Sequence, residues 1–260
     1  AQRARAKLWP SRAHDRKVLM LMGCVQPSMM PNVNSAMARV LDAVGIQTVV
    51  ADGAGCCGAI REHLADHEGA LKDMRRNVDA WFPLLDRGGV EAIVMNASGC
   101  GVAVKDYGHA LAHDKAYAER AKRVSDSTLD LSEVLPKIVP ALLKKLELRR
   151  GGKPDANAPK LRVAFHPPCT LQHGQQRRGD VEAGLEALGF DVAIMGAESH
   201  LCCGSAGTYS VLQPELSTSL RDRKLKNIEP LKPQVIASAN IGCIQHLQGG
   251  TSTRVTHWIE

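Results

Sequence analysis

The feature that most constrains this chain is a repeated spacing of its cysteines. The sequence has 260 residues and eight cysteines, and a Cys-Cys-Gly triplet occurs twice, at residues 56–58 and 202–204. Each triplet is preceded by one cysteine and followed by another, which gives the two series Cys24, Cys56, Cys57, Cys100 and Cys169, Cys202, Cys203, Cys243. Equivalent members are separated by 143 to 146 residues, and the flanking sequences also agree. The chain is therefore an internal duplication.

Each repeat predicts alternating strands and helices. In the first repeat, short apolar runs predict strands at 17–23, 46–50 and 91–97, and helical spacing predicts helices at about 31–44 and 67–82. The second repeat has the same order, with strands at 161–166, 190–196 and 234–240 and helices at about 179–188 and 214–228. This order favours an α/β fold in two pseudo-symmetric repeats, each a parallel sheet flanked by helices.

The predicted domains follow the repeats. Residues 1–16 are charged and lack an apolar run, so we expect a linker that continues from an upstream segment. Residues 17–150 form the first cysteine-rich domain and residues 151–260 the second, with the polar, Gly/Pro-rich stretch 149–160 as the boundary. Before this boundary we expect two more helices, at about 114–123 and 130–147, the second broken by its prolines and packed into the core through an apolar stripe.

Charge and hydropathy exclude several classes of protein. The net charge is +6, but the basic residues are scattered and aromatic residues make up only 3%, which argues against nucleic-acid binding. The positive net charge is equally consistent with a basic face that contacts an acidic partner subunit or an anionic membrane surface. No apolar run approaches the ~20 residues of a membrane span, and the N-terminal stretch lacks the apolar region of a secretory signal. Metal or redox chemistry is therefore favoured over four disulfides for the eight cysteines.

The predicted strands bring the cysteines together. Each cysteine follows a strand or the loop beyond it, and the carboxyl ends of parallel strands share the edge where α/β sheets bind ligands. Gly58 and Gly204 tolerate a positive φ, which lets two adjacent sulfurs face one site. Four thiols can hold an iron–sulfur cluster or zinc, although the usual Cys-x-x-Cys spacings are absent. A disulfide between neighbouring cysteines is strained, and inert buried cysteines are the remaining alternative.

Beyond this spacing, the chain resembles a known family. The Cys…Cys-Cys-Gly…Cys pattern is similar to the cysteine-rich CCG domain, which occurs twice in the cysteine-rich component of heterodisulfide reductase. The glycolate oxidase iron-sulfur subunit family is more similar, over about residues 17–260, through "GCCGAIREHL", "NASGCG", "HPPCTLQHGQQ", "SHLCCGSAGTYSVLQPEL" and "HWIE". The resemblance implies that the cysteines ligate iron–sulfur clusters of the 4Fe-4S type at one or two sites, and zinc is an alternative at one of them.

The resemblance also has a departure. The full CCG pattern ends in Cys-x-x-Cys, but Ala103 and His246 stand where the last cysteine belongs. The five-thiol, noncubane cluster of that pattern is therefore not expected, and His246 is a candidate extra ligand because imidazole can replace thiolate on iron. His166, His173 and His200 flank the second cysteine series and are candidates to tune a cluster by hydrogen bonding, together with the two triplet glycines.

The function implied by the resemblance is electron transfer. The chain is expected to be the iron–sulfur subunit of a glycolate-oxidising complex that passes electrons from a flavin-containing dehydrogenase subunit toward a quinone-type acceptor. An upstream ferredoxin-type domain is implied as well, and the expected location is the cytoplasm, including peripheral association with the inner face of the cytoplasmic membrane. The alternatives are a thiol–disulfide reductase related to heterodisulfide reductase and a non-catalytic zinc-binding or docking subunit.

Overall fold

The computed structural model describes residues 7–152 and 158–260, which form two compact units. The first unit runs to Leu131 and includes Ile259–Glu260, and the second spans Ser132–Trp258. The predicted linker 1–16 and the predicted boundary stretch 149–160 lie partly outside the described residues.

The first unit is built on a four-stranded parallel sheet with the order β2-β1-β3-β4. Its strands are β1 (Arg16–Met20), β2 (Ile46–Val49), β3 (Ile93–Met95) and β4 (Thr128–Asp130). The central strand β1 pairs with β2 through Leu19 and Val49 and with β3 through Leu19 and Ile93. Leu19 and Ile93 are fully buried, as expected for strands that helices cover on both faces.

Seven helices accompany this sheet. They are α1 (Gln26–Met29), α2 (Asn32–Ala43), α3 (Ala59–His63), α4 (His67–Asp86), α5 (Ser98–Lys105), α6 (Tyr107–Ala110) and α7 (Ala118–Asp126). The long helix α4 begins where Asp66 accepts a hydrogen bond from the backbone N–H of Gly69 at 3.1 Å. Its apolar residues Met74, Val78 and Trp81 recur at helical spacing and are buried in the core, so α4 covers one face of the sheet.

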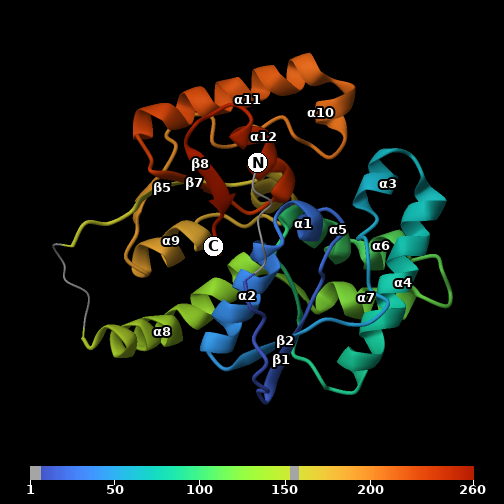
Figure 1. Cartoon of the computed structure of the whole chain (residues 1–260). Helices are drawn as coiled ribbons and strands as arrows, with labels where there is room; N and C mark the ends of the chain where they lie inside the picture. The colour runs from blue at the N-terminus through green and yellow to red at the C-terminus, as the bar shows by residue number, and fades with distance from the viewer. Residues whose placement is uncertain (1–6, 153–157) are drawn as a thin grey trace. The chain divides into compact units, whose positions relative to one another are not determined.

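The second unit repeats this topology with the order β6-β5-β7-β8. Its strands are β5 (Arg162–His166), β6 (Asp191–Ala193), β7 (Val235–Ser238) and β8 (Arg254–His257). Its helices are α8 (Leu131–Arg150), the π-helix η1 (Thr170–Gly174), α9 (Asp180–Ala187), α10 (Tyr209–Leu212), α11 (Pro214–Ile228), the 3₁₀ helix η2 (Glu229–Leu231) and α12 (Ile241–Gln248). Figure 1 shows α11 on one side of these strands and α9 on the other. Two parallel α/β repeats are thus confirmed.

The structure differs from the sequence-based expectation in its short elements and in α8. The fourth strand of each sheet, β4 and β8, was not expected. Helix α8 is continuous through Pro136 and Pro140, so the predicted break is wrong. Both prolines lie on the exposed side of the helix, while Leu135 and Ile138 anchor its buried face. The compact units divide between Leu131 and Ser132, so nearly all of α8 belongs to the second unit. The domain boundary predicted between residues 150 and 151 stays a prediction.

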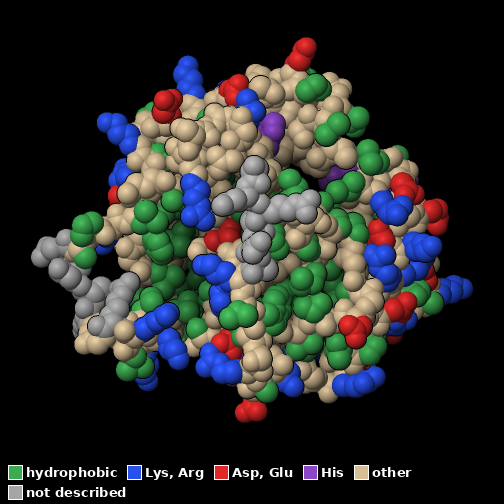
Figure 2. Space-filling view, in the orientation of Figure 1, with side chains coloured by type: hydrophobic (Ala, Val, Ile, Leu, Met, Phe, Trp, Pro, Cys, Tyr) green, Lys and Arg blue, Asp and Glu red, His purple; other side chains and the backbone are tan. Residues whose placement is uncertain are grey.

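The surface carries its charges in mixed groups. On the face shown in Figure 2, Lys and Arg side chains are interspersed with Asp and Glu rather than collected in one area. Within the described residues, no helix combines the length and the apolar character that crossing a bilayer requires.

Candidate metal centres

The cysteines of each unit lie at the carboxyl edge of its sheet. In the first unit, Cys24 lies between β1 and α1, Cys56 and Cys57 lie between β2 and α3, and Cys100 is the third residue of α5, directly after β3. Strands β2 and β3 lie on opposite sides of β1, so the chain leaves β1 toward one side and later returns on the other. Parallel α/β sheets bind ligands at the carboxyl edge where the strand order changes direction in this way. The predicted convergence of the first series is therefore built into the topology.

The second unit places its cysteines in the equivalent positions. Cys169 follows β5 at the start of η1, Cys202 and Cys203 lie between β6 and α10, and Cys243 is the third residue of α12. The last cysteine of each series follows a strand, as expected, and stands in the first turn of the next helix. Each of these helices begins within three residues of the preceding strand.

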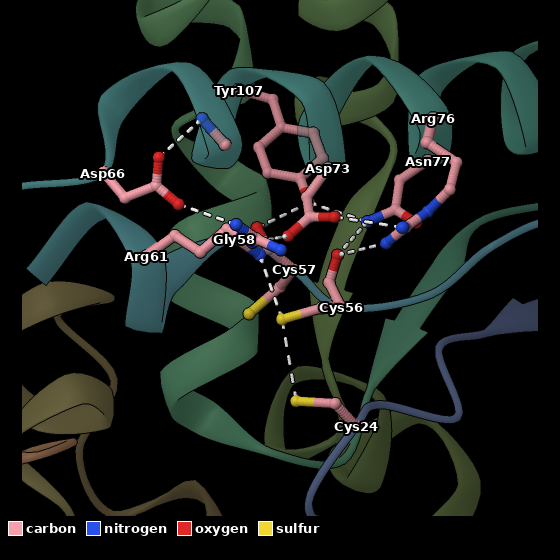
Figure 3. A network of polar contacts seen from close by, with 11 residues as sticks. Cys24, Cys56, Cys57, Gly58, Arg61, Asp66, Asp73, Arg76, Asn77 and Tyr107 are labelled. Carbon is pink, nitrogen blue, oxygen red and sulfur yellow. Dashed lines mark hydrogen bonds and ion pairs between the residues drawn. The ribbon is translucent and has the colours of Figure 1, made fainter. Parts of the chain in front are cut away.

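The four thiols of the first unit form a chain of contacts. Cys24 Sγ lies 3.6 Å from Cys56 Sγ, and Figure 3 shows these two sulfurs facing each other with Cys57 beside them. The thiols of Cys100 and Cys56 both raise the pKa of the Cys57 thiol, and Cys57 in turn lowers the pKa of Cys100. We call this group the first quartet. Its members come from two loops and the first turn of α5, three segments that are far apart in sequence.

The thiols of the second unit repeat this chain. The thiols of Cys169 and Cys203 lower the pKa of Cys202, and Cys203 also lowers the pKa of Cys243. Ser205 joins the group, with its Oγ 3.4 Å from Cys203 Sγ and 3.8 Å from Cys243 Sγ. We call the four cysteines the second quartet. Cys203 and Cys243 are almost fully buried, so this quartet is shielded from water on one side.

The glycine after each cysteine pair directs the pair toward one site. Gly58 and Gly204 have φ of +88° and +92°, a left-handed conformation that other residues rarely adopt. In this conformation the N–H of Gly58 donates to Cys56 Sγ at 3.5 Å, and the N–H of Gly204 donates to Cys202 Sγ at 3.3 Å. Each Cys-Cys-Gly triplet therefore supplies two sulfurs and a backbone donor that stabilises negative charge on the first.

Hydrogen bonds between thiols set the pKa order within each quartet. The pKa of Cys56 is lowered to about 2, chiefly because Cys24 donates to its sulfur, and the pKa of Cys24 is raised for the same reason. Cys202 repeats this behaviour, with a pKa lowered to about 2 by the hydrogen bond from Cys169. One sulfur of each contacting pair therefore favours the thiolate, which is the form that binds metals.

Two buried side chains hold the first cysteine pair in place. Asn77 on α4 donates from Nδ2 to the carbonyl of Cys56 at 2.8 Å, and its Oδ1 accepts from the N–H of Gly55 at 2.8 Å. Tyr107 donates its hydroxyl proton to the carbonyl of Cys57 at 2.9 Å, and Asn77 donates to the same hydroxyl oxygen at 3.0 Å. The two side chains are fully buried, and Figure 3 shows them between the cysteine pair and the helices behind it, so the backbone of the pair is fixed from the interior.

A balanced ion cluster surrounds the first cysteine pair. Arg76 Nη1 lies 3.0 Å from Asp73 Oδ1, and its other nitrogen lies 3.4 Å from the carbonyl of Cys56. Asp73 also pairs with Arg61 Nε at 3.1 Å, and Arg61 pairs in turn with Asp66 at 2.6 Å. Two arginines therefore face two aspartates, and the formal charges of this cluster cancel.

In the second unit, helix α11 holds the cysteine loop. Ser217 donates its hydroxyl proton to the carbonyl of Gly204 at 2.8 Å. The carbonyl and hydroxyl oxygens of Ser217 also lie 3.1 and 3.0 Å from His246 Nε2. Ligation by that nitrogen requires the ring to leave Ser217, so this geometry favours a packing role for His246, and its role as an extra ligand stays a prediction.

The other predicted histidines hold the loops of the second quartet. His166 ends β5 fully buried, with Nδ1 3.1 Å from Ser238 Oγ, and burial lowers its pKa to about 3. His173 Nε2 lies 2.9 Å from the carbonyl of His200, which ties η1 to the loop before Cys202. These contacts join protein groups to one another, and an effect of the histidines on a cluster remains a prediction.

Several residues that shape the sites were not predicted from the sequence. They are Asn77, Tyr107, Ser217 and Lys224, all polar and all almost fully buried. Asn77 stands among the buried apolar residues of α4, such as Met74, Val78 and Trp81, and this position is the signal that marks it. Lys224 stands in the polar helix α11 and has no such signal in the sequence. A polar residue at an inward helical position needs a buried partner, which here is the cysteine loop.

The donor sets fit a sulfur-bound group. Each quartet presents four thiols at one sheet edge, with backbone donors toward sulfur, which suits soft, thiolate-binding metal groups such as an iron–sulfur cluster. Within the residues that the structure describes, no group of three or more His, Cys, Asp or Glu side chains has the arrangement of a metal-ion site. The sulfurs lie in a row rather than in a shell around one ion. The assignment to an iron–sulfur cluster therefore rests on the chemistry of the four thiols.

Two four-thiol sites at equivalent edges of a duplicated parallel α/β unit define a tandem cysteine-rich protein. The chain belongs to the cysteine-rich domain family, whose CCG model matches residues 18–105 and 163–248. These two matched segments contain both quartets completely, including the helices that carry Cys100 and Cys243.

Individual relatives agree with this membership. The chain is 47% identical over 260 residues to the glycolate oxidase iron-sulfur subunit of Escherichia coli (strain K12), covering 100% of this chain and 60% of that protein. It is 25% identical over 240 residues to lactate utilization protein A of Bacillus licheniformis, covering 90% of this chain and 91% of that protein. The chain thus spans only about 60% of the length of the E. coli relative.

The similarity to solved structures is weak. An aspartate racemase homologue from Pyrococcus horikoshii OT3 aligns over 94% of both chains, with 12% identity and a TM-score of 0.32. This similarity is too low to support an argument about fold or function.

Proposed function

We propose that this chain is the iron–sulfur electron-transfer part of a complex that oxidises a 2-hydroxy acid such as glycolate. The main support for the proposal is the pair of thiol quartets. The cysteines of each quartet come from three separate segments of the chain at the ligand-binding edge of a parallel sheet. The name of the E. coli relative supports iron–sulfur chemistry and glycolate, and lactate utilization protein A supports the wider class of 2-hydroxy acids.

Each quartet is proposed to bind one four-iron cluster through its four thiolates. The ligands are Cys24, Cys56, Cys57 and Cys100 in the first unit and Cys169, Cys202, Cys203 and Cys243 in the second. A bound cluster supplies one-electron chemistry. The chain's own contribution is to aim the sulfurs, to donate backbone N–H groups to them, and to bury the inner members away from water.

The proposal assigns substrate oxidation to another subunit. Thiols and backbone amides dominate both sites, whereas hydride chemistry on a 2-hydroxy acid is the work of a cofactor such as flavin. We therefore propose a flavin-containing dehydrogenase subunit as the electron donor, an upstream ferredoxin-type domain as a further relay, and a quinone-type acceptor. A cytoplasmic location, with peripheral association at the inner face of the membrane, belongs to the same proposal.

Metal and sulfide analysis of anaerobically purified protein tests the assignment. About four iron and four sulfide per filled quartet, together with a low-temperature EPR signal after reduction, is the expected result. Cys57→Ser and Cys203→Ser each remove one buried ligand, so each variant is expected to lose the iron and the signal of its own quartet only. Zinc without sulfide would replace the proposal with a docking role, and full iron in both variants would refute the ligand sets.

A further inference from the structure

The two quartets are held by equivalent helices but by different side chains. Gly58 packs against Ala70 of α4, whose carbonyl oxygen lies 3.1 Å from the position of a glycine Cβ, and Gly204 packs in the same way against Ser217 of α11. These contacts align Ala70 with Ser217. A second position that faces the interior lies seven residues, or about two helical turns, further along each helix. That position is occupied by Asn77 in the first unit and by Lys224 in the second.

Both residues support the loop that leads into a cysteine pair. Asn77 binds the backbone at Gly55 and Cys56. Lys224 donates from Nζ to the carbonyl oxygens of Glu198 at 2.6 Å and Ser199 at 3.2 Å, just before the second cysteine pair. Asn77 and Lys224 are 0% and 1% exposed, so each is a buried polar side chain that holds the backbone before a cysteine pair. They differ in charge. Asn77 is neutral, whereas Lys224 brings a cation into the interior.

The buried ammonium of Lys224 is close enough to the second quartet to act on it. Burial lowers the pKa of Lys224, while the sulfurs of Cys203 and Cys202, the carboxylate of Glu198 and the sulfur of Cys243 act on it in the opposite direction and favour its charged form. Its hydrogen-bond acceptors are backbone carbonyls rather than carboxylates. The charge of Lys224 is therefore directed toward the cysteine loop without being cancelled by the groups it binds.

The charges near the first quartet do cancel. Arg76 lowers the pKa of Cys56, but Arg76 is paired with Asp73, and its side chain is 44% exposed to screening by water. In the second unit, the acidic side chain that adjoins the Lys224 contacts is Glu198, whose carboxylate is paired at the surface with Arg223 Nε at 2.8 Å. The second quartet thus faces a buried positive charge where the first quartet faces the neutral Asn77.

We propose that Lys224 makes the two sites electrostatically unequal, so that a cluster held by the second quartet is more easily reduced than one held by the first. Reduction adds one electron to the cluster, makes or breaks no bond and requires no proton. The electron comes from the reduced flavin of the partner subunit, or from dithionite in a titration. A fixed positive charge in a low-dielectric interior stabilises the more negative product. This inference rests on the proposed function.

The test is an EPR-monitored redox titration of anaerobically purified protein in a Cys57→Ser background, which removes the signal of the first quartet. Lys224→Met removes the buried charge and is expected to lower the ratio of reduced to oxidised cluster about tenfold at fixed potential, equal to about 59 mV for one electron. Lys224→Gln gives a second uncharged variant if the methionine variant does not fold. Lys224→Arg keeps the charge and is expected to keep the potential.

The matched control is Lys226→Met, which removes an exposed lysine from the same helix. It changes the net charge by the same amount, but solvent screens that position, so the potential is expected to stay unchanged. Equal shifts for Lys224→Met and Lys226→Met, or no shift for either, would overturn the inference while leaving the electron-transfer proposal intact. A Cys57→Ser parent without iron or signal would instead overturn the proposed second cluster, and the inference with it.

Discussion

Substitution of the glycine after each cysteine pair tests how tightly helix and loop are packed at the two sites. An alanine at Gly204 would place its Cβ 2.3 Å from the carbonyl oxygen of Ser217 and 3.1 Å from His246 Nε2. At Gly58 the nearest atom is the carbonyl oxygen of Ala70 at 3.1 Å, which a shift of a few tenths of an ångström relieves. Gly179 has the same left-handed backbone, φ +83°, with nothing within 4 Å of its Cβ position. The three glycines therefore separate backbone strain from steric overlap.

The expected costs follow from these distances. A left-handed φ costs an alanine about 1–2 kcal/mol, partly offset by about 0.4–1 kcal/mol from the reduced freedom of the unfolded chain. Gly179→Ala is therefore expected to lower the free energy of unfolding by about 1 kcal/mol, and Gly58→Ala by about 1–2 kcal/mol. Gly204→Ala adds an overlap with helix backbone, for which overpacking costs of about 1–3 kcal/mol are typical. Its total is therefore expected to be about 2–4 kcal/mol.

Urea unfolding of the metal-free protein measures these differences. Pulsed hydrogen–deuterium exchange with mass spectrometry reads each unit from its own peptides, so a change in the second unit is not confused with one in the first. Gly204→Ala is expected to destabilise the second unit more than Gly179→Ala in the same unit. Equal losses for these two variants would show that α11 moves away from the loop freely, and would refute the close packing described here.

Two further predictions concern buried polar groups. Asn77→Ala removes two hydrogen bonds to the first cysteine loop, at Gly55 and Cys56, and is expected to lower the free energy of unfolding by about 2–4 kcal/mol in the same assay. Unchanged protection of that loop would contradict this. The pKa of His166 is about 3 when folded and about 6.5 when unfolded, so the unfolded state binds more protons between these values and stability falls as the pH falls. We expect His166→Asn to remove about 2 kcal/mol of the stability difference between pH 7 and pH 5, and an unchanged pH dependence would contradict the burial of a neutral imidazole.

The main elements could be predicted from the sequence because their signals are local. The apolar run of β1 and the helical spacing of Met74, Val78 and Trp81 each lie within a few residues of one another, and the duplication let one repeat support the other. Strand β4 has only three residues, Thr128–Asp130, which is too short for a periodic pattern to show. Helix α8 passes through two prolines because its exposed face tolerates them, a fact that depends on the surrounding packing.

The two cysteine series could be read from the sequence, and their role as ligands stays a prediction, whereas the residues that support them could not be identified. The cysteines carry their own signal, since a thiol pattern repeated twice points to one chemistry. Asn77 carries only its place among the apolar residues of α4, and Lys224 carries no signal until the fold shows which side of α11 faces the cysteine loop. Likewise, the position of His246 next to the missing fifth cysteine suggested a ligand, whereas its contacts with Ser217 depend on how α11 and α12 pack.

The cysteines of each quartet lie on three separate segments of the chain, so a group bound by all of them would restrain the chain. In the first unit the sulfurs belong to residues 24, 56, 57 and 100, so anything bound by all four closes two large rings of chain, much as a cross-link does. Such rings restrict the denatured ensemble, and release of the bound group would free the three segments while leaving the hydrogen bonds of the sheet unbroken. Loss of the bound group is therefore expected to loosen the rim of each unit first, with the opposite edge of the sheet still folded.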